Sequence, residues 1–143
     1  TTNFIMQASQ TQASQTRNIP PNQLAGFNVD HAVERMLGQP TLWWEALGMF
    51  VHHFAEWEAD WQTSQSSNEA ERRCVHALRS SAANIGADHL SCIAATLEEL
   101  LAKRCVGQDV AIPPSIRGYL KDCFRETWRT AAAAKQLTIT THS

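Results

Sequence analysis

His76 has the surroundings in this sequence that suit chemistry best. On a helix of about 100° per residue, its neighbours on the same face are Arg72, Arg79, Ser80 and Ala83. A nucleophilic imidazole must be neutral, and nearby positive charge disfavours the imidazolium. A phosphoryl group bound to the ring would carry negative charge that a guanidinium can contact through charge-assisted hydrogen bonds. The spacing therefore suits a phosphoryl carrier.

The side chains beside His76 also determine how closely another molecule can approach the ring. Ser80 and Ala83 are small, which leaves room for a partner's active site. Arg72 and Arg73 are candidate partner-binding residues on the same side of the helix. The spacing alone still favours a simpler interpretation, because most solvent-facing histidines between arginines are ordinary surface residues.

A helix over about residues 68–85 is needed to hold His76 away from the core. The residues predicted to face inward are Cys74, Leu78, Ser81, Ala82 and Ile85. His76 lies about 200° from Cys74 around the helix axis, on the opposite face. Asn68 followed by Glu71 is similar to a capping box and predicts the start of this helix.

Apolar residues at steps of three or four predict four further helices, over residues 28–37, about 41–61, 88–107 and from 113 onward. The second carries the broadest apolar stripe, which consists of Trp43, Leu47, Phe50, Phe54, Trp57 and Trp61. Trp44 lies off this stripe, and Asp88 is the expected cap of the fourth helix. Short loops favour antiparallel neighbours, so the predicted fold class is all-α: an antiparallel up-and-down four-helix bundle with a short N-terminal helix.

The composition is that of one globular domain. Of the 143 residues, 43% are hydrophobic and 18% are charged, and the net charge of −2 gives no reason to expect nucleic-acid or membrane-surface binding. No apolar run approaches the roughly 20 residues that span a bilayer. None of the four cysteines forms a C-x-x-C pair, so we expect them to be reduced rather than bridged or bound to zinc. They are Cys74, Cys92, Cys105 and Cys123.

The two ends of the chain differ from its middle. The sequence Gln-Ala-Ser-Gln-Thr occurs at 7–11 and again at 12–16, and such polar sequence buries too little apolar surface to offset its ordering entropy. We therefore expect a flexible Gln/Ser/Thr-rich linker over 1–26, one domain over 27–137 and a disordered tail over 138–143. The linker and the missing initiator Met indicate a piece of a longer protein.

One group of polar residues invites a metal-site interpretation, namely Glu45, His52, His53 and Glu56. His52 and Glu56 are one helical turn apart, but no second pair of ligands is evident elsewhere in the sequence. Structural and catalytic metal sites need three or four ligands. Surface polar residues are therefore the preferred interpretation.

The last predicted helix carries a basic stripe at strict i+4 spacing, formed by Arg117, Lys121, Arg125 and Arg129. Asp122 and Glu126 lie beside the stripe and can pair with it at i+3. This pattern favours a solvated face, with a docking surface for another domain of the same protein as the alternative.

The stretch around His76 also has a specific local pattern. It reads His76-Ala-Leu78-Arg79-Ser80-Ser81-Ala82-Ala83-Asn84-Ile85-Gly86-Ala87, continuing to Leu90 and Leu97-Glu98. Upstream stand Gly26-Phe27-Asn28-Val29-Asp30 and the helix with Leu42, Leu47, Phe50 and Phe54. Over roughly residues 24–106 this closely resembles the histidine-containing phosphotransfer (HPt) domain. Arg79 stands in place of the family's usual Lys, and Ser80 in place of its usual Gly.

The resemblance implies that His76 accepts a phosphoryl group from a receiver-domain aspartate and passes it to another response-regulator aspartate, with Arg79 and Ser80 beside it. It implies no cofactor in this domain and Mg²⁺ on the partner receiver. The sequence has no Gly-rich phosphate loop or kinase motif, so no ATP site is expected. We expect the cytoplasmic C-terminal module of a bacterial hybrid sensor histidine kinase. As an isolated domain it should be monomeric, without contacts to nucleic acid or membrane.

Two other functions stay open at this point. A non-phosphorylated helical module that binds receiver or kinase domains would keep the fold without the chemistry, and Ser80 in place of Gly is its main support. A metal-binding four-helix bundle would need carboxylate and histidine pairs on facing helices, which the sequence lacks.

Overall fold

The computed structural model describes residues 19–140, with side chains described for residues 19–136. Its helices, in chain order, are α2 (Val29–Arg35), α3 (Pro40–His53), α4 (Trp57–Ser64), α5 (Asn68–Asn84), α6 (Asp88–Cys105) and α7 (Pro114–Thr140). Within the described residues the only β-type pairing is an isolated bridge between Leu24 and Phe27. The predicted all-α fold class is confirmed.

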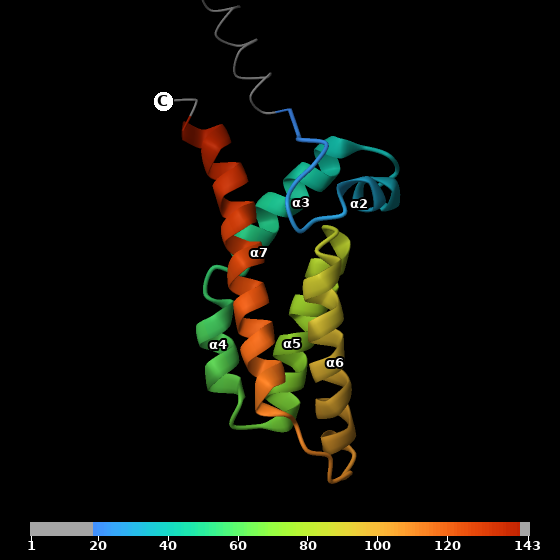
Figure 1. Cartoon of the computed structure of the whole chain (residues 1–143), viewed down its shortest axis with the longest axis vertical. Coiled ribbons are helices and arrows are strands. Elements are labelled where there is room, and N and C mark those ends of the chain that lie inside the picture. Colours follow the sequence, from blue (N-terminus) through green and yellow to red (C-terminus); the bar gives the residue numbers. More distant parts are fainter. Residues whose placement is uncertain (1–18, 141–143) are drawn as a thin grey trace, which may run out of the picture.

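The helices form an antiparallel bundle with α2 across one end (Figure 1). One leg of the bundle consists of α3 and α4 in succession, and α5, α6 and α7 form the other three. α5 packs against α6 and α4, while α7 packs against α6 and α3. α2 contacts α3 and α5 near the turn between α5 and α6. The middle of α5 is therefore supported by packed helices on both sides.

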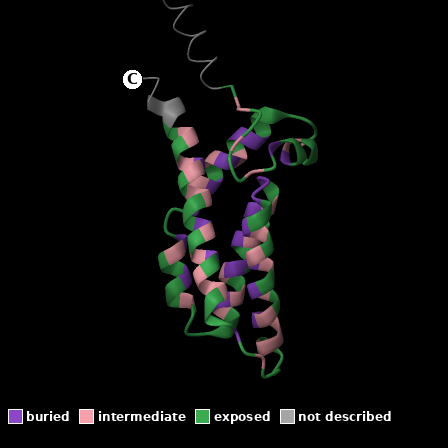
Figure 2. Cartoon of the chain, in the orientation of Figure 1, coloured by how far each residue is buried: buried purple, intermediate pink, exposed green. Residues whose placement is uncertain are grey.

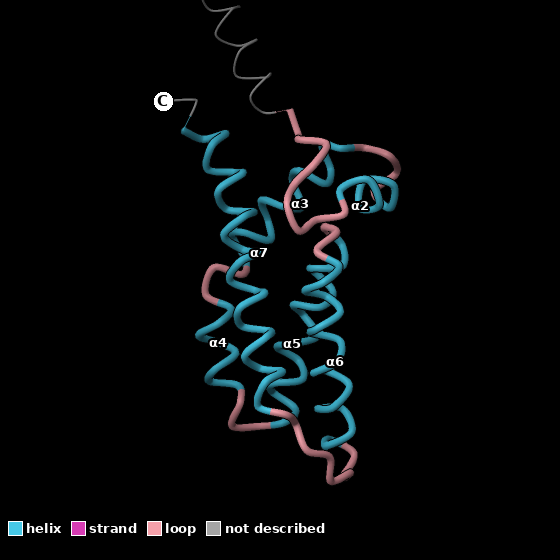
Figure 3. Tube along the Cα trace, in the orientation of Figure 1, coloured by secondary structure: helices cyan, strands magenta, loops and turns pink. Residues whose placement is uncertain are grey.

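The leg formed by α3 and α4 differs from the single helix predicted over 41–61. The helix is interrupted between His53 and Trp57, as Figure 3 shows. Phe54 and Trp57 on either side of the break are both buried. After the break, the indole of Trp57 donates to the carbonyl of Cys74 at 3.0 Å. The break thus changes the direction of the chain so that Phe54 and Trp57 are both buried and the indole N–H of Trp57 has a hydrogen-bond acceptor.

Two predicted N-caps, Asn68 and Asp88, each lie one residue after the observed cap. Ser67, in extended backbone geometry, caps α5 by accepting a hydrogen bond from the Ala70 amide, so Asn68 is the first helical residue. α6 begins at Asp88 with Ala87 as its cap, and no side chain caps it. Asp88 still lies in the first turn, where its negative charge interacts favourably with the positive end of the helix dipole. The predicted cap of the first helix, Asn28, is confirmed.

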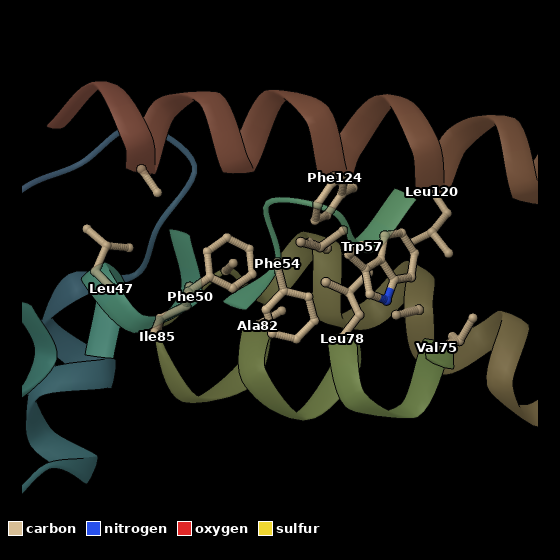
Figure 4. Packing of buried hydrophobic residues seen from close by; sticks show 14 of the residues in the cluster. Leu47, Phe50, Phe54, Trp57, Val75, Leu78, Ala82, Ile85, Leu120 and Phe124 are labelled. Atoms are coloured by element: carbon tan, nitrogen blue, oxygen red, sulfur yellow. The ribbon is translucent and has the colours of Figure 1, made fainter. Parts of the chain in front are cut away.

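The core is built from large aromatic and aliphatic side chains of all four legs (Figure 4). The ring centroids of Trp57 and Phe124 are 4.8 Å apart, and those of Trp57 and Trp61 are 5.0 Å apart. Trp44, predicted to lie off the apolar stripe, is also buried. Figure 2 shows the buried residues on the sides of the helices that face one another.

The inward face of α5 is rotated slightly from the predicted one. Cys74 and Ser81 are only half-buried, whereas Glu71 and Val75, absent from the predicted set, are fully buried. Glu71 has partners on two other helices, Trp61 of α4 and Arg117 of α7, which a wheel of one helix does not include. His76 stays on the outer face in either case.

The predicted ends of the chain are only partly described. The repeated segments at 7–11 and 12–16 lie outside the described residues, and 19–28 form a loop that contains the bridge noted above. α7 continues to Thr140, so residues 138–140 of the predicted tail are helical, while 141–143 lie outside the described part. In the described residues, no helix combines the length and the apolar character that crossing a bilayer requires.

Candidate functional site

The exposed face of α5 presents His76 near the middle of a 17-residue helix. The His76 side chain is 49% exposed. Its ring nitrogen Nδ1 has polar neighbours, described below, whereas Nε2 has no hydrogen-bond partner among the described residues. The imidazole therefore combines one held nitrogen with one nitrogen open to another molecule.

Glu98 of α6 is the group that holds the ring. Its Oε2 lies 2.6 Å from Nδ1 of His76, and the Glu98 side chain is only 14% exposed. A hydrogen bond of this length to a carboxylate is at the strong end of the range. With the proton on Nδ1, the ring donates to Glu98, and the lone pair of Nε2 points away from the pair.

Arg79 lies on the other side of the same carboxylate. Its Nε is 2.6 Å from Glu98 Oε1, but this atom is buried and makes no aligned hydrogen bond. Its Nη2 is 3.4 Å from His76 Nδ1. When Nδ1 carries the proton, it can donate to Glu98 but cannot accept from Arg79, whose guanidinium only donates. The two contacts therefore cannot both be hydrogen bonds. We assign Nδ1 to Glu98, which is much nearer, so the polar atoms of Arg79 are incompletely satisfied.

The register of α5 against α6 brings Glu98 to His76. The two helices run antiparallel after a connection of only three residues, 85–87. Further along the same pair, Ser91 Oγ donates to the carbonyl of Arg79 at 3.2 Å. At the far end, Glu69 of α5 lies close to Cys105 of α6, where desolvation and then the Glu69 carboxylate raise the pKa of the thiol. Residue numbers fall along α5 as they rise along α6, as expected for an antiparallel pair. This register places Glu98 beside His76.

The predicted basic surroundings of His76 are confirmed only for Arg79. Arg72 turns to Glu69 instead, with distances of 2.7 Å and 3.1 Å between its nitrogens and the carboxylate oxygens. Arg73 lies 3.6 Å from the same carboxylate. The Arg72 hydrogen bond lowers the pKa of Glu69 to about 2. Arg72 and Arg73 are therefore paired one turn away from the ring.

The predicted small residues lie beside the ring on α5. Ser80 is exposed one turn beyond His76, and Ala83 is half-buried about one turn further. The hydroxyl of Ser80 makes no hydrogen bond within the described residues. Their roles in binding a partner stay predictions.

Glu98 is the residue that sequence reasoning missed. It stood inside the Leu97-Glu98 pair that contributed to the family resemblance, but no role was assigned to it. The only sequence signal is its chemical type: a carboxylate on the helix that follows, on a side that meets α5. Only the register of the two helices brings it to the ring.

The basic stripe of α7 is not a uniformly solvated face. Arg117 forms a bidentate ion pair with the buried carboxylate of Glu71. Arg125 forms another with Glu58 of α4. Of the i+3 pairs expected within the helix, the pair of Asp122 with Arg125 is therefore replaced by the pair of Arg125 with Glu58. Partners on other helices offer better geometry than the i+3 positions.

The other polar residues considered in the sequence do not gather into a site. In the part of the chain that the structure describes, no three His, Cys, Asp or Glu side chains are placed to hold a metal ion. The rings of His52 and His53 are 5.5 Å apart and exposed. All four cysteines are free, as expected, and burial raises the pKa of the Cys74 and Cys123 thiols.

Comparison with known proteins gives one finding. The family model described as the Hpt domain matches residues 42–130, which include His76, Arg79 and Glu98 and leave α2 outside. No curated protein and no solved structure gives a significant match.

Proposed function

The chain belongs to the Hpt domain family, and on this premise we propose that His76 is its phosphoacceptor, which takes a phosphoryl group from a receiver-domain aspartate and passes it to the aspartate of another response regulator. Hpt domains carry a phosphoryl group on a histidine in phosphorelays and interact with receiver domains. The single observation that carries the assignment to His76 is its exposed ring, held at Nδ1 by Glu98 with Nε2 left open.

The proposed chemical step begins at Nε2. Its lone pair attacks the phosphorus of the receiver's aspartyl phosphate, and a nitrogen–phosphorus bond forms. The phosphorus–oxygen bond to the aspartate breaks, and the carboxylate leaves with the electron pair. The proton on Nδ1 stays between the ring and Glu98, so the carboxylate stabilises the positive charge that develops on the imidazole. The reverse step delivers the group to a second aspartate.

Arg79 is proposed to contact the transferred group. Its Nη2 lies 3.4 Å from His76 Nδ1, and the Arg79 side chain is 41% exposed. The exposed nitrogens of the guanidinium can donate charge-assisted hydrogen bonds to a phosphoryl oxygen on the ring. Mg²⁺ and further carboxylates would come from the receiver, as phosphoryl transfer requires.

The setting of the domain is also a proposal. We place it as the cytoplasmic C-terminal module of a bacterial hybrid sensor histidine kinase, with His76 acting between receiver domains. The support is the family membership and the repeated Gln/Ser/Thr-rich sequence within 1–26, whose composition is typical of an interdomain linker.

The test is transfer of label from receiver domains of the same genome, each phosphorylated on its aspartate with acetyl phosphate carrying ³²P. We expect acid-labile label on the wild-type chain and none on His76→Gln. His89→Gln is the matched control, because His89 is exposed on the side of α6 that faces α7. Acid-stable label, or label that persists in His76→Gln, would refute the assignment.

Ser80 supports a second candidate, a receiver-binding module without phosphoryl chemistry. Its exposed hydroxyl stands one turn from His76, where close docking leaves little room. This candidate predicts receiver binding that His76→Gln leaves unchanged, with no label on the wild type in the same assay.

A further inference from the structure

Helix α2 lies outside the range that the Hpt family model matches, yet it is closely packed on the bundle. Val29 and Ala32 are buried, and the Asn28 amide donates to the Gly86 carbonyl at 2.8 Å. Gly86 has φ +84°, and a Cβ there would lie 2.5 Å from the Asn28 carbonyl oxygen. Only glycine permits this approach. α2 is thus fixed rigidly to the turn between α5 and α6.

The last residue of α2, Arg35, extends from this fixed helix onto α5. Its Nη2 donates to the carbonyl of Ala83, and its side chain is exposed. Ala83 follows His76 by seven residues, which is nearly two turns, so the two lie about 20° apart around the helix and about 10.5 Å apart along it. Arg35 therefore places a positive charge at the end of the same face that presents His76.

A protein that docks on His76 covers this position. A standard interface buries about 800 Å² on each partner, which corresponds to a disc of about 16 Å radius. A disc centred on His76 includes the Ala83 carbonyl and the Arg35 guanidinium bound to it. Four of the five N–H donors of Arg35 make no bond within the described residues and are available to a partner.

We propose that Arg35 is a charged residue at the rim of the receiver-docking surface, where it speeds association by attracting the anionic phosphorylated face of the receiver. The proposal rests on the proposed phosphoacceptor function of His76. The occupant is a receiver domain whose aspartyl phosphate gives its docking face negative charge. A rim charge acts mainly on the association rate and on its salt dependence, not on the bound complex. The Ala83 carbonyl that Arg35 binds lies about 10.5 Å from His76 along α5, so Arg35 takes no part in bond making.

The test uses the full chain and the receiver that labels His76 fastest in the assay above, phosphorylated with acetyl phosphate and varied in concentration. We expect Arg35→Gln to lower kcat/KM for transfer by about 3- to 10-fold at low salt, with an unchanged rate at saturating receiver. At about 0.5 M salt the difference should shrink, because screening shortens the range of the charge. Arg35→Lys should stay within about twofold of the wild type, because it keeps the charge.

Two controls make the result decisive. Arg129→Gln removes the same charge from the exposed surface of α7, which packs against α3 and α6, and should leave transfer unchanged. In the wild-type chain, backbone amide NMR signals of Glu34 and Arg35 should shift together with that of Ser80 when the receiver is added. This measurement does not depend on whether Arg35→Gln folds.

Three outcomes would overturn the proposal. Equal kcat/KM for Arg35→Gln and the wild type at every salt concentration would do so, as would a loss confined to the saturated rate. Signals of α2 that stay still while those of α5 shift would have the same consequence. In each of these cases His76 is still labelled, so the phosphoacceptor function stands. Absence of label on the wild-type chain refutes both.

Discussion

Glu71 on α5 and Glu98 on α6 are both carboxylates held by an arginine and a ring nitrogen, but their surroundings differ. Glu71 is 1% exposed and lies inside the bundle. It accepts from Trp61 Nε1 at 3.0 Å and from Arg117 Nε and Nη2 at 2.9 Å and 2.6 Å. Both of its oxygens thus have aligned donors.

Glu98 has a less complete set of partners. One oxygen meets His76 Nδ1, while the other lies against a nitrogen of Arg79 without hydrogen-bond alignment. A buried charge needs a complete set of partners, because an unsatisfied one is costly. Glu98 tolerates an incomplete set because its partners His76 and Arg79 are exposed to solvent, and the guanidinium can turn to a new acceptor. The complete set of partners around Glu71 suits a carboxylate that stabilises the fold. The incomplete set around Glu98 suits a site where a phosphoryl group binds and leaves.

The largest expected effect comes from Glu71→Ala. It leaves the guanidinium of Arg117 without its partner in a setting where only 29% of that side chain is exposed. We expect the free energy of unfolding to fall by about 3 kcal/mol, measured by urea denaturation. Transfer to His76, measured per folded molecule, should change less than twofold.

The double substitution Glu71→Leu with Arg117→Met is the control for this first prediction. Apolar residues of similar volume remove both charges together, so most of the lost stability should return. If Glu71→Ala lost less than about 1 kcal/mol, the buried pair would be no more important than a surface pair and the contrast with Glu98 would disappear.

The next effect in size is that of Glu98→Ala on transfer. The substitution removes both the acceptor that orients the ring and the charge that stabilises it. We expect the transfer rate at saturating receiver to fall about 10- to 100-fold, or about 1.4–2.7 kcal/mol in activation free energy. Stability should fall by less than about 1 kcal/mol, since the partners left behind, His76 and Arg79, are 49% and 41% exposed and can be solvated.

Two variants separate the roles within this second prediction. Glu98→Gln keeps an oxygen that can accept from Nδ1 but removes the charge, so its rate should lie between those of Glu98→Ala and the wild type. Glu99→Ala changes the adjacent residue, which is exposed and lies 3.6 Å from Lys103, and should leave the rate unchanged. Equal rates for Glu98→Ala and the wild type would show that the carboxylate does not hold the ring for transfer.

Local periodicity was sufficient to predict the bundle and the outward position of His76. Both depend on which residues of one helix are apolar, and that information lies within a few turns of sequence. Arg79 was found for the same reason, since a residue three positions away shares the face. The ends of the helices were predicted to within a few residues.

The contacts between helices could not be predicted in this way. Glu98 meets His76, and Arg117 meets Glu71, only through the register and rotation of packed helices. The break between α3 and α4 contains no Gly or Pro, so no local signal marks it. It depends on the packing of Phe54 and Trp57 and on the indole's acceptor on α5.

The smallest expected effect comes from the exposed counterpart of the Glu71 pair, Glu58 with Arg125. The hydrogen bond from Arg125 lowers the pKa of Glu58 below its ordinary value of 4.5. A carboxyl whose pKa is lower in the folded state contributes stability above its unfolded pKa, and this contribution is lost as the pH falls through the lowered value. Arg125 is 43% exposed, so we expect only the small stabilisation of a solvated ion pair at neutral pH.

Comparison of Arg125→Gln with the wild type by urea unfolding between pH 7 and pH 2 measures this contribution. The variant should be slightly less stable than the wild type at pH 7, and the difference should vanish at the acid end, where Glu58 is protonated in both folded and unfolded chains. Arg129→Gln, which removes a charge from the same helix without breaking the pair, should show a smaller difference. A difference for Arg125→Gln that stays constant over the whole pH range would mean that the guanidinium acts by packing its stem, because a charge effect must disappear with the charge of its partner.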